Sequence, residues 1–287
     1  MEHKTSILKK IIWGLIGIFS AWIFCYGLIH LGGYALESYR QNKLSQELLG
    51  YREQFGAVGA GRDAQAVALP DAAADDGAMT GVGVSGVAGM DSSTGEADGA
   101  VSGEQLAELY AQLYERNNDY VFWLTIPDTR IDYPVVQQDN TFYLQHDFYG
   151  ARNAHGAIFL DEQCAADGRA LLVHGHHMKD GTMFAALKQY KDDAWCESHR
   201  TVELYDKEER HIYTVFAVAR VDLTDEGSFR YEELPTEAEA LKTYVDSLAY
   251  RAFWYQDPQF GETDRLLVLS TCDYGTEDER LVVFCTE

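Results

Sequence analysis

The feature that most restricts how this chain can fold is a run of 21 uncharged, mostly apolar residues near the N-terminus, from Ile11 to Leu31. As a helix the run would be roughly 32 Å long, which matches the hydrocarbon layer of a bilayer. A cleaved signal peptide has a shorter apolar region, of about 7 to 15 residues, and a small-residue cleavage site, which residues 32–35 (GGYA) match poorly. We therefore predict an uncleaved transmembrane helix at residues 11–31. A buried helix of a soluble domain is the alternative, but it would need covering neighbours that the flanking sequence lacks.

The charges beside this helix predict its orientation. Lys4, Lys9 and Lys10 precede it, whereas Arg40 and Lys43 follow it. Because basic residues tend to stay on the cytoplasmic side, we expect the first ten residues in the cytoplasm and everything after the helix outside the cell. The protein is therefore expected in the cell membrane, as a single-pass protein with an extracellular domain.

The rest of the chain divides into three segments. Residues 32–55 mix charges with spaced apolar residues, which predicts a short juxtamembrane helix. Residues 56–103 lack aromatic residues and are rich in Gly, Ala and Asp, so we expect a flexible linker that acts as a spacer with a reach of about 40 Å. Residues 104–287 have the composition of a folded domain, with 16 basic and 35 acidic residues. Because the whole chain has a net charge of −23, nucleic acid is not expected as a partner.

The folded domain at residues 104–287 has the pattern of a mainly β protein. Its first residues, 104–118, have a helical spacing of leucines, and further helical stretches are predicted at residues 183–190 and 236–250. Eight short β-type runs lie at residues 121–126, 131–136, 157–160, 170–174, 201–205, 212–221, 265–270 and 281–285. Eight short strands with few helices predict a closed or nearly closed β-barrel.

The five cysteines narrow the search for a reactive residue. Cys25 lies in the predicted membrane helix, and the absence of a CxxC pair excludes a zinc ribbon. Cys272 ends an apolar run and precedes a polar turn, a position at the rim of a barrel that suits a nucleophile. We expect Cys164, Cys196 and Cys285 to be buried or half-buried, and a domain of this size does not require disulfides among them.

Partners for a cysteine nucleophile are present. Residues 174–177 (HGHH) follow another apolar run, and Arg280 begins the strand after the Cys272 turn. A histidine transfers protons and an arginine stabilises an oxyanion, so the sequence predicts a Cys-His-Arg site. The HxHxD zinc pattern is the alternative for the histidines, but it needs an Asp where this chain has Met178, so we expect no metal and no other cofactor.

These residues belong to a series of motifs that resembles class B sortases, the membrane-anchored cysteine transpeptidases of Gram-positive bacteria. The motifs are residues 121–127 (VFWLTIP), 131–137 (IDYPVVQ), 142–150 (FYLQHDFYG), 156–161 (GAIFLD), 175–184 (GHHMKDGTMF) and 269–272 (LSTC), followed by Arg280. Each string alone is a weak signal, but the ordered set across nearly the whole folded domain, with a membrane helix upstream, is highly specific. The resemblance implies an eight-stranded sortase β-barrel with a few short helices.

The resemblance also implies roles for the site residues. Cys272 is expected to be the nucleophile, His176 the catalytic histidine and Arg280 the arginine that stabilises the oxyanion or positions the substrate. His174 stands where class B members often have Tyr, and His177 is expected to be a loop residue.

Contacts with the substrate are expected close to these residues. Ser270 and Thr271 belong to the Ser-Thr-Cys string, although Ser270 has the alternative of only satisfying its own turn. A helix at about residues 232–250, including Tyr244, resembles the helix that forms one wall of the class B peptide groove. Leu171 is also expected to contact the substrate.

The activity that the resemblance implies is that of a cysteine endopeptidase and transpeptidase. The enzyme is expected to cleave the C-terminal sorting signal of a secreted surface protein, of the Asn-Pro-x-Thr type usual for class B, through a thioester. It would then transfer the protein to an amine of peptidoglycan or of a lipid-linked precursor. Pilin polymerisation, a catalytically idle adaptor barrel and a cell-wall peptidase that uses water are the alternatives.

Overall fold

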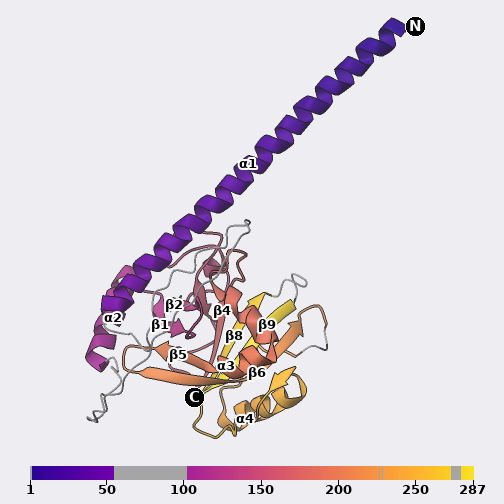
Figure 1. Ribbon diagram of the computed structural model, residues 1–287. Coiled ribbons are helices and arrows are strands. Elements are labelled where there is room, and N and C mark those ends of the chain that lie inside the picture. Colours follow the sequence, from indigo (N-terminus) through magenta and orange to yellow (C-terminus); the bar gives the residue numbers. More distant parts are fainter. Residues whose placement is uncertain (1, 55–101, 226, 228, 273–278) are drawn as a thin grey trace, which may run out of the picture.

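The computed structural model describes residues 2–54, 102–225, 227, 229–272 and 279–287 (Figure 1). The helices are α1 (Glu2–Gln54), α2 (Gly103–Arg116), α3 (Asp193–Ser198) and α4 (Ala238–Ser247), with 3-10 helices η1 (Phe142–Leu144), η2 (Phe184–Lys191) and η3 (Leu248–Tyr250). The strands are β1 (Tyr120–Thr125), β2 (Asp132–Val136), β3 (Ile158–Leu160), β4 (Ala170–Gly175), β5 (Thr201–Tyr205), β6 (Arg210–Asp222), β7 (Trp254–Tyr255), β8 (Leu266–Cys272) and β9 (Glu279–Thr286).

Eight of these strands close into a barrel. The hydrogen-bonded order is β5-β1-β2-β3-β4-β8-β9-β6, and β5 also pairs with β6, which joins the two ends of the sheet. The short strand β7 pairs with β6 outside the ring. The predicted eight-stranded β-barrel with few helices is therefore confirmed, and closure leaves few unpaired strand edges.

All eight predicted strands are present, with ends that differ by at most two residues from the predicted ones. The two-residue strand β7 and the six-residue helix α3 were not predicted, because segments this short show no recognisable hydrophobic period. The stretch predicted as helical at residues 183–190 is the 3-10 helix η2. Helix α2 starts with a capping box between Ser102 and Gln105, which satisfies free amide groups of its first turn.

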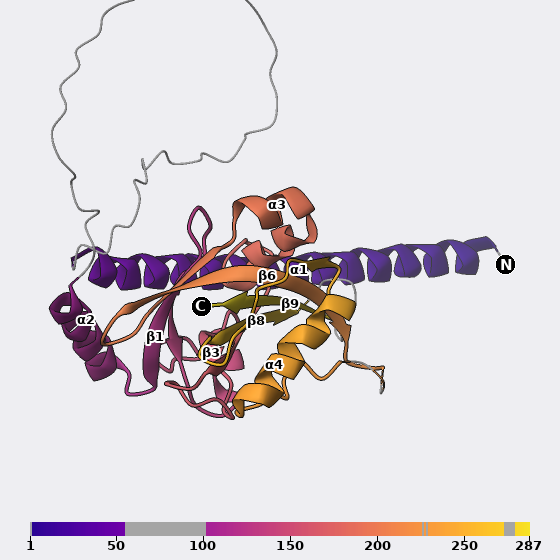
Figure 2. The same cartoon turned by 90° about the horizontal axis from the view of Figure 1, so that it is seen from below.

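Buried apolar side chains form three clusters, which reflect the alternation of strand residues between the two faces of the sheet. One cluster fills the barrel and includes Leu124, Val173 and Leu269. A second lies on the outer face of β4, β8, β9 and β6, where α4 covers it. A third lies on the outer face of β1, β2 and β3, under α1 and α2. Figure 2 shows α1 and α4 on different sides of the barrel.

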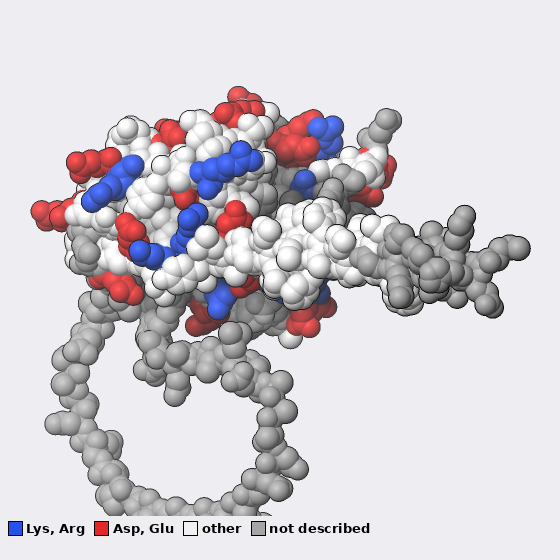
Figure 3. All heavy atoms as spheres, turned by 90° about the horizontal axis from the view of Figure 1, so that it is seen from above, with Lys and Arg blue, Asp and Glu red and all other residues white. Residues whose placement is uncertain are grey.

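Helix α1 runs without interruption from the predicted membrane segment into the predicted juxtamembrane helix. Between Gly17 and Glu53 it is long and apolar enough to cross a membrane. Its most apolar stretch has a mean hydropathy of 1.3, and none of the residues in that stretch is buried against the rest of the protein. Figure 3 shows uncharged atoms along the part of α1 that leaves the barrel.

The C-terminal part of α1 packs on the barrel. Leu48 is buried there, the Arg52 side chain pairs with Asp132 of β2, and Gln41 accepts a hydrogen bond of 2.9 Å from Asn153. The predicted linker at residues 56–103 lies outside the described residues except for its last two, at the start of α2. Because α1 already contacts the barrel before this segment, the helix itself connects the apolar region with the folded domain.

Candidate active site

The register of three neighbouring strands brings the predicted catalytic residues to one end of the barrel. Strands β4 and β8 are parallel, so that His174 lies opposite Ser270 and β4 ends at Gly175, directly before His176. Strands β8 and β9 are antiparallel, and Cys272 is the direct cross-strand partner of Arg280. Only the backbone of Cys272 is described, and it places this residue at the last position of β8.

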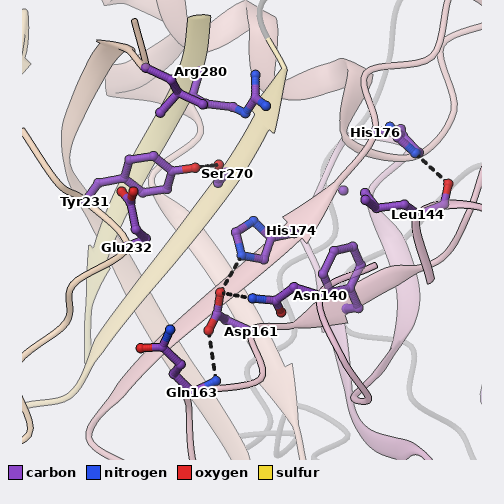
Figure 4. Close-up of a pocket in the computed structure, with 13 residues that line it drawn as sticks. Asn140, Leu144, Asp161, Gln163, His174, His176, Tyr231, Glu232, Ser270 and Arg280 are labelled. Atoms are coloured by element: carbon purple, nitrogen blue, oxygen red, sulfur yellow. Dashed lines mark hydrogen bonds and ion pairs between the residues drawn. The ribbon is translucent and has the colours of Figure 1, made fainter. Parts of the chain in front are cut away.

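A pocket of about 300 Å³ opens at this end of the barrel (Figure 4). It is lined by residues of the β3, β4, β8 and β9 region, of the loop after β2 and of the segment that follows β6: Asn140, Leu144, Phe159, Asp161, Gln163, His174, Gly175, His176, Leu223, Tyr231, Glu232, Ser270 and Arg280. The pocket thus has an apolar part and a set of polar groups that point into a shared space, as substrate sites have.

The position of His176 depends on closely packed neighbours. Its Nε2 lies 2.8 Å from the carbonyl oxygen of Leu144, and because a carbonyl only accepts, Nε2 carries the proton. Gly156 lies against the ring with φ +63°, and a Cβ on it would be 3.2 Å from His176 Cδ2 and 2.4 Å from the oxygen of Tyr143. This close approach needs a glycine, so the GAIFLD string contributes to placing the histidine.

Arg280 is half-buried at the start of β9, and its Nη1 donates to the carbonyl of Glu279 at 3.2 Å. A guanidinium remains charged at any pH that a protein tolerates. The pocket therefore holds a permanent positive charge beside the last position of β8, where an oxyanion formed at Cys272 would need it.

Of the residues predicted to contact the substrate, only one lines the pocket within the described part of the chain. Ser270 lines the pocket, and its Oγ donates to the hydroxyl of Tyr231 at 2.9 Å. Leu171 is completely buried in the barrel interior and Thr271 is also buried; neither is among the described residues that line the pocket. Tyr244 on α4 does not line it either, but its hydroxyl donates to the backbone oxygen of Tyr231 at 2.9 Å. Tyr244 therefore supports the pocket wall rather than forming it.

A second imidazole in the pocket is held by a carboxylate that was not singled out from the sequence. His174 Nε2 lies 3.0 Å from Asp161 Oδ2, and Asn140 donates to the same oxygen at 2.9 Å. Asp161 ends the GAIFLD string, directly after a strand that pairs with β4. This location was the available signal, but the antiparallel pairing of β3 with its neighbour β4 was needed to connect Asp161 with His174.

The other described thiols outside α1 are poor nucleophiles. Burial raises the pKa of Cys164 to about 11 and that of Cys196 to about 12, and it also raises the pKa of the completely buried Cys285. A thiol of this kind carries almost no thiolate at neutral pH. All three are unpaired, so the predicted buried or half-buried cysteines are confirmed.

Comparison with known proteins agrees with this fold. The sortase domain family matches residues 124–287. Sortase B of Listeria monocytogenes is 32% identical over 183 residues, which are 63% of this chain and 73% of that protein. The structure of Clostridium perfringens sortase B is similar with a TM-score of 0.56 at 31% identity, over 61% of this chain and 97% of that chain. A Staphylococcus aureus sortase B–substrate complex has a TM-score of 0.55 at 26% identity, over 63% of this chain and 84% of that chain.

The chain therefore belongs to the sortase family, whose members are cysteine transpeptidases. The relatives named above are sortase B proteins, so within the family it is of class B. Helices α1 and α2 both precede the matched domain, which begins in β1.

Proposed function

We propose that this protein is a membrane-anchored class B transpeptidase that cleaves the sorting signal of a secreted protein and joins the new C-terminus to a cell-wall amine. The observation that carries the proposal is the strand register. It makes Cys272 and Arg280 direct cross-strand partners, while His176 and Arg280 line one pocket. A nucleophile, a proton-transfer group and a fixed positive charge at one site suit acyl transfer.

In the first half-reaction, the Cys272 thiolate attacks the scissile carbonyl and a C–S bond forms. The charge that develops on the carbonyl oxygen is stabilised by Arg280. His176, protonated at this stage, gives a proton to the departing amine as the C–N bond breaks. The product is a thioester between Cys272 and the sorted protein, with His176 neutral.

In the second half-reaction, an acceptor amine attacks the thioester carbonyl. The new C–N bond forms as the C–S bond breaks, and Cys272 leaves as a thiolate. His176 takes one proton from the amine and so returns to its starting state. The bulk of Leu144, Phe159 and Leu223 on the pocket wall limits access of water, which would otherwise hydrolyse the thioester.

The substrate that we propose is a signal of the Asn-Pro-x-Thr type. This is the type that the resemblance to class B sortases implies, and the relatives support the class but do not name a signal. Ser270 and Tyr231, linked by a hydrogen bond on the pocket wall, are the polar groups that we assign to the peptide.

We also propose the location of the enzyme. Helix α1 anchors it in the cell membrane with the N-terminus in the cytoplasm, because the lysines precede the apolar region. The barrel then lies outside the cell, close to the membrane, since the same helix continues onto β2. Secreted proteins and cell-wall amines are available there.

The test uses the full chain in detergent micelles with a quenched peptide that contains Asn-Pro-Gln-Thr, with and without glycinamide as acceptor. We expect peptide cleavage, a thioester detected by mass spectrometry and a ligated product, all of them lost in Cys272→Ala. Cys164→Ala is the matched control, since that thiol is half-buried with a raised pKa, and it should retain activity.

Other outcomes would contradict parts of the proposal. Faster cleavage of a Leu-Pro-x-Thr-Gly peptide would reject the substrate type. Cleavage without a ligated product at any amine concentration would indicate a peptidase. A folded wild-type protein that forms no thioester with either peptide would favour an idle adaptor barrel.

A further inference from the structure

His174 is a second imidazole in the pocket, and the reaction described above does not use it. It lies on β4 opposite Ser270, and its side chain is 20% exposed. Figure 4 shows it between the His176 side of the pocket and the side of Tyr231 and Glu232. The ring also packs on Phe159, with 5.2 Å between the ring centroids, which fixes its orientation.

The protonation pattern of His174 follows from Asp161. Burial opposes ionisation of this carboxyl, but hydrogen bonds from His174, the backbone of Gln163 and Asn140 outweigh it and lower the pKa of Asp161. Asp161 is therefore a carboxylate, which only accepts hydrogen bonds. The neutral imidazole consequently carries its proton on Nε2, facing Asp161, and a lone pair on Nδ1.

The Nδ1 atom of His174 is available to accept a hydrogen bond from a ligand. It has no hydrogen-bond partner among the described residues, and in Figure 4 it points away from Asp161. Glu232, another pocket residue, has a buried Oε2 that likewise lacks a hydrogen-bond partner within the described part of the chain. The pocket thus contains an imidazole acceptor backed by a carboxylate, and a second carboxylate with an unused oxygen.

We propose that His174 and Asp161 form the binding site for the acceptor, a primary amine that arrives as an ammonium ion and donates a hydrogen bond to Nδ1. This inference rests on the proposed function and names the group that receives the second substrate. A neutral peptide N–H could also donate to Nδ1, but it would gain little from the charges of Asp161 and Glu232. An ammonium ion is attracted by both carboxylates. Two cations act on the same region: Arg280 lines the pocket, and Arg230 pairs with the other oxygen of Glu232 at 3.1 Å.

The proton balance of the second half-reaction gives this site a chemical role. An ammonium nitrogen carries three protons and the amide nitrogen of the product carries one, so two protons must leave. His176 takes the one that it lost in the first half-reaction. His174 takes the other at Nδ1, becomes an imidazolium that Asp161 stabilises, and then releases the proton to water.

The test measures the ratio of ligated to hydrolysed product, because both products come from the same thioester and effects on its formation cancel. The full chain in detergent micelles is given the Asn-Pro-Gln-Thr peptide and increasing glycinamide. His174→Phe removes the acceptor and keeps a ring against Phe159, and Asp161→Asn removes the supporting charge. His199→Phe is the matched control, because this half-buried imidazole stacks on Trp195 at 3.4 Å, outside the pocket.

We expect the ratio at subsaturating glycinamide to fall about tenfold in His174→Phe, the effect of one lost hydrogen bond to a charged group, and to fall in Asp161→Asn as well. It should not change in His199→Phe. An unchanged ratio in His174→Phe would overturn the amine site while leaving the proposed function intact. Absence of any thioester in the wild type would instead reject the proposed function.

A binding measurement tests the site without turnover. In Cys272→Ala labelled at histidine Cε1, the NMR signal that His174→Phe removes should shift saturably as glycinamide is added. The shift should weaken in Asp161→Asn. If glycinamide produces no saturable shift of that signal, the amine site is rejected whatever the activity of the enzyme.

Discussion

Two outer faces of the same barrel bury charged groups in different ways. Under α1, Asp132 accepts hydrogen bonds from Trp123 at 2.7 Å and Thr125 at 2.8 Å and pairs with Arg52, with both charged side chains less than one-tenth exposed. Next to the pocket, the Asp161 carboxylate is equally buried, but its partner His174 faces the pocket. Both carboxylates are paired, as buried charges must be. The difference is in the cover: α1 and α2 close one face, whereas the other region lies at the pocket and is open for chemistry.

The largest effect is expected on the open face. Replacing Arg280 with Gln should lower kcat/KM for peptide cleavage by about 10²- to 10³-fold, because the transition-state oxyanion loses its charged partner. The melting temperature should change little. The control is Arg200→Gln, since Arg200 is also half-buried and bonded to a backbone carbonyl, but lies away from the pocket. Similar losses of kcat/KM in both variants would show that Arg280 does not stabilise the oxyanion.

On the closed face, Arg52→Ala should lower the free energy of unfolding by about 3 kcal/mol, because it leaves the Asp132 carboxylate buried without its counter-charge. Chemical denaturation of the full chain measures this loss. The double variant with Asp132→Asn should recover part of it, which separates the unpaired charge from lost packing. A loss below 0.5 kcal/mol, roughly that of an exposed ion pair, would show that the pair is not buried in solution.

Gly156→Ala tests a contact that links packing to catalysis. The alanine would adopt a positive φ and its Cβ would overlap the oxygen of Tyr143 beside His176, so we expect a stability loss of about 2 kcal/mol and a lower kcat. Gly150 has a similar φ of +74° with nothing within 4 Å of an added Cβ. Gly150→Ala therefore isolates the backbone strain, and equal effects of the two substitutions would reject steric displacement of His176.

The smallest effect concerns His211 near the start of β6, which is not among the described residues that line the pocket. Burial lowers its pKa, but hydrogen bonds to Glu287 and Asp206 outweigh this and raise the pKa above its ordinary value. A raised pKa means that the pairing stabilises the fold fully below about pH 6.5, the unfolded value, and that this contribution is lost as pH rises through the folded pKa.

The stability difference between wild type and His211→Gln should therefore be larger at pH 5.5 than at pH 9, by less than about 1 kcal/mol. Urea denaturation at the two pH values measures it. A difference that is independent of pH would show that His211 does not titrate with its carboxylate partners.

Strand positions were predictable because local signals mark them, and the same kind of signal singled out the three residues that we propose for catalysis. Short β-type runs marked the eight strands, and Cys272 and Arg280 lie near strand ends. Leu171 and Tyr244 show the limit of this reasoning. Their burial and orientation depend on which face each element presents to the barrel, and a single sequence does not contain the packing that decides this.

The sequence by itself determined that an apolar helix precedes a mainly β domain, because helical length and strand period are local properties of the chain. It also placed Cys272, His176 and Arg280 in order within recognisable motifs. Only the tertiary structure decided that α1 packs on the barrel through Arg52 and Asp132, and that Asp161 holds His174 at the pocket. Arg52 and Asp132 are 80 positions apart and Asp161 and His174 are 13 apart, and burial of their charges becomes favourable only when folding brings the partners together.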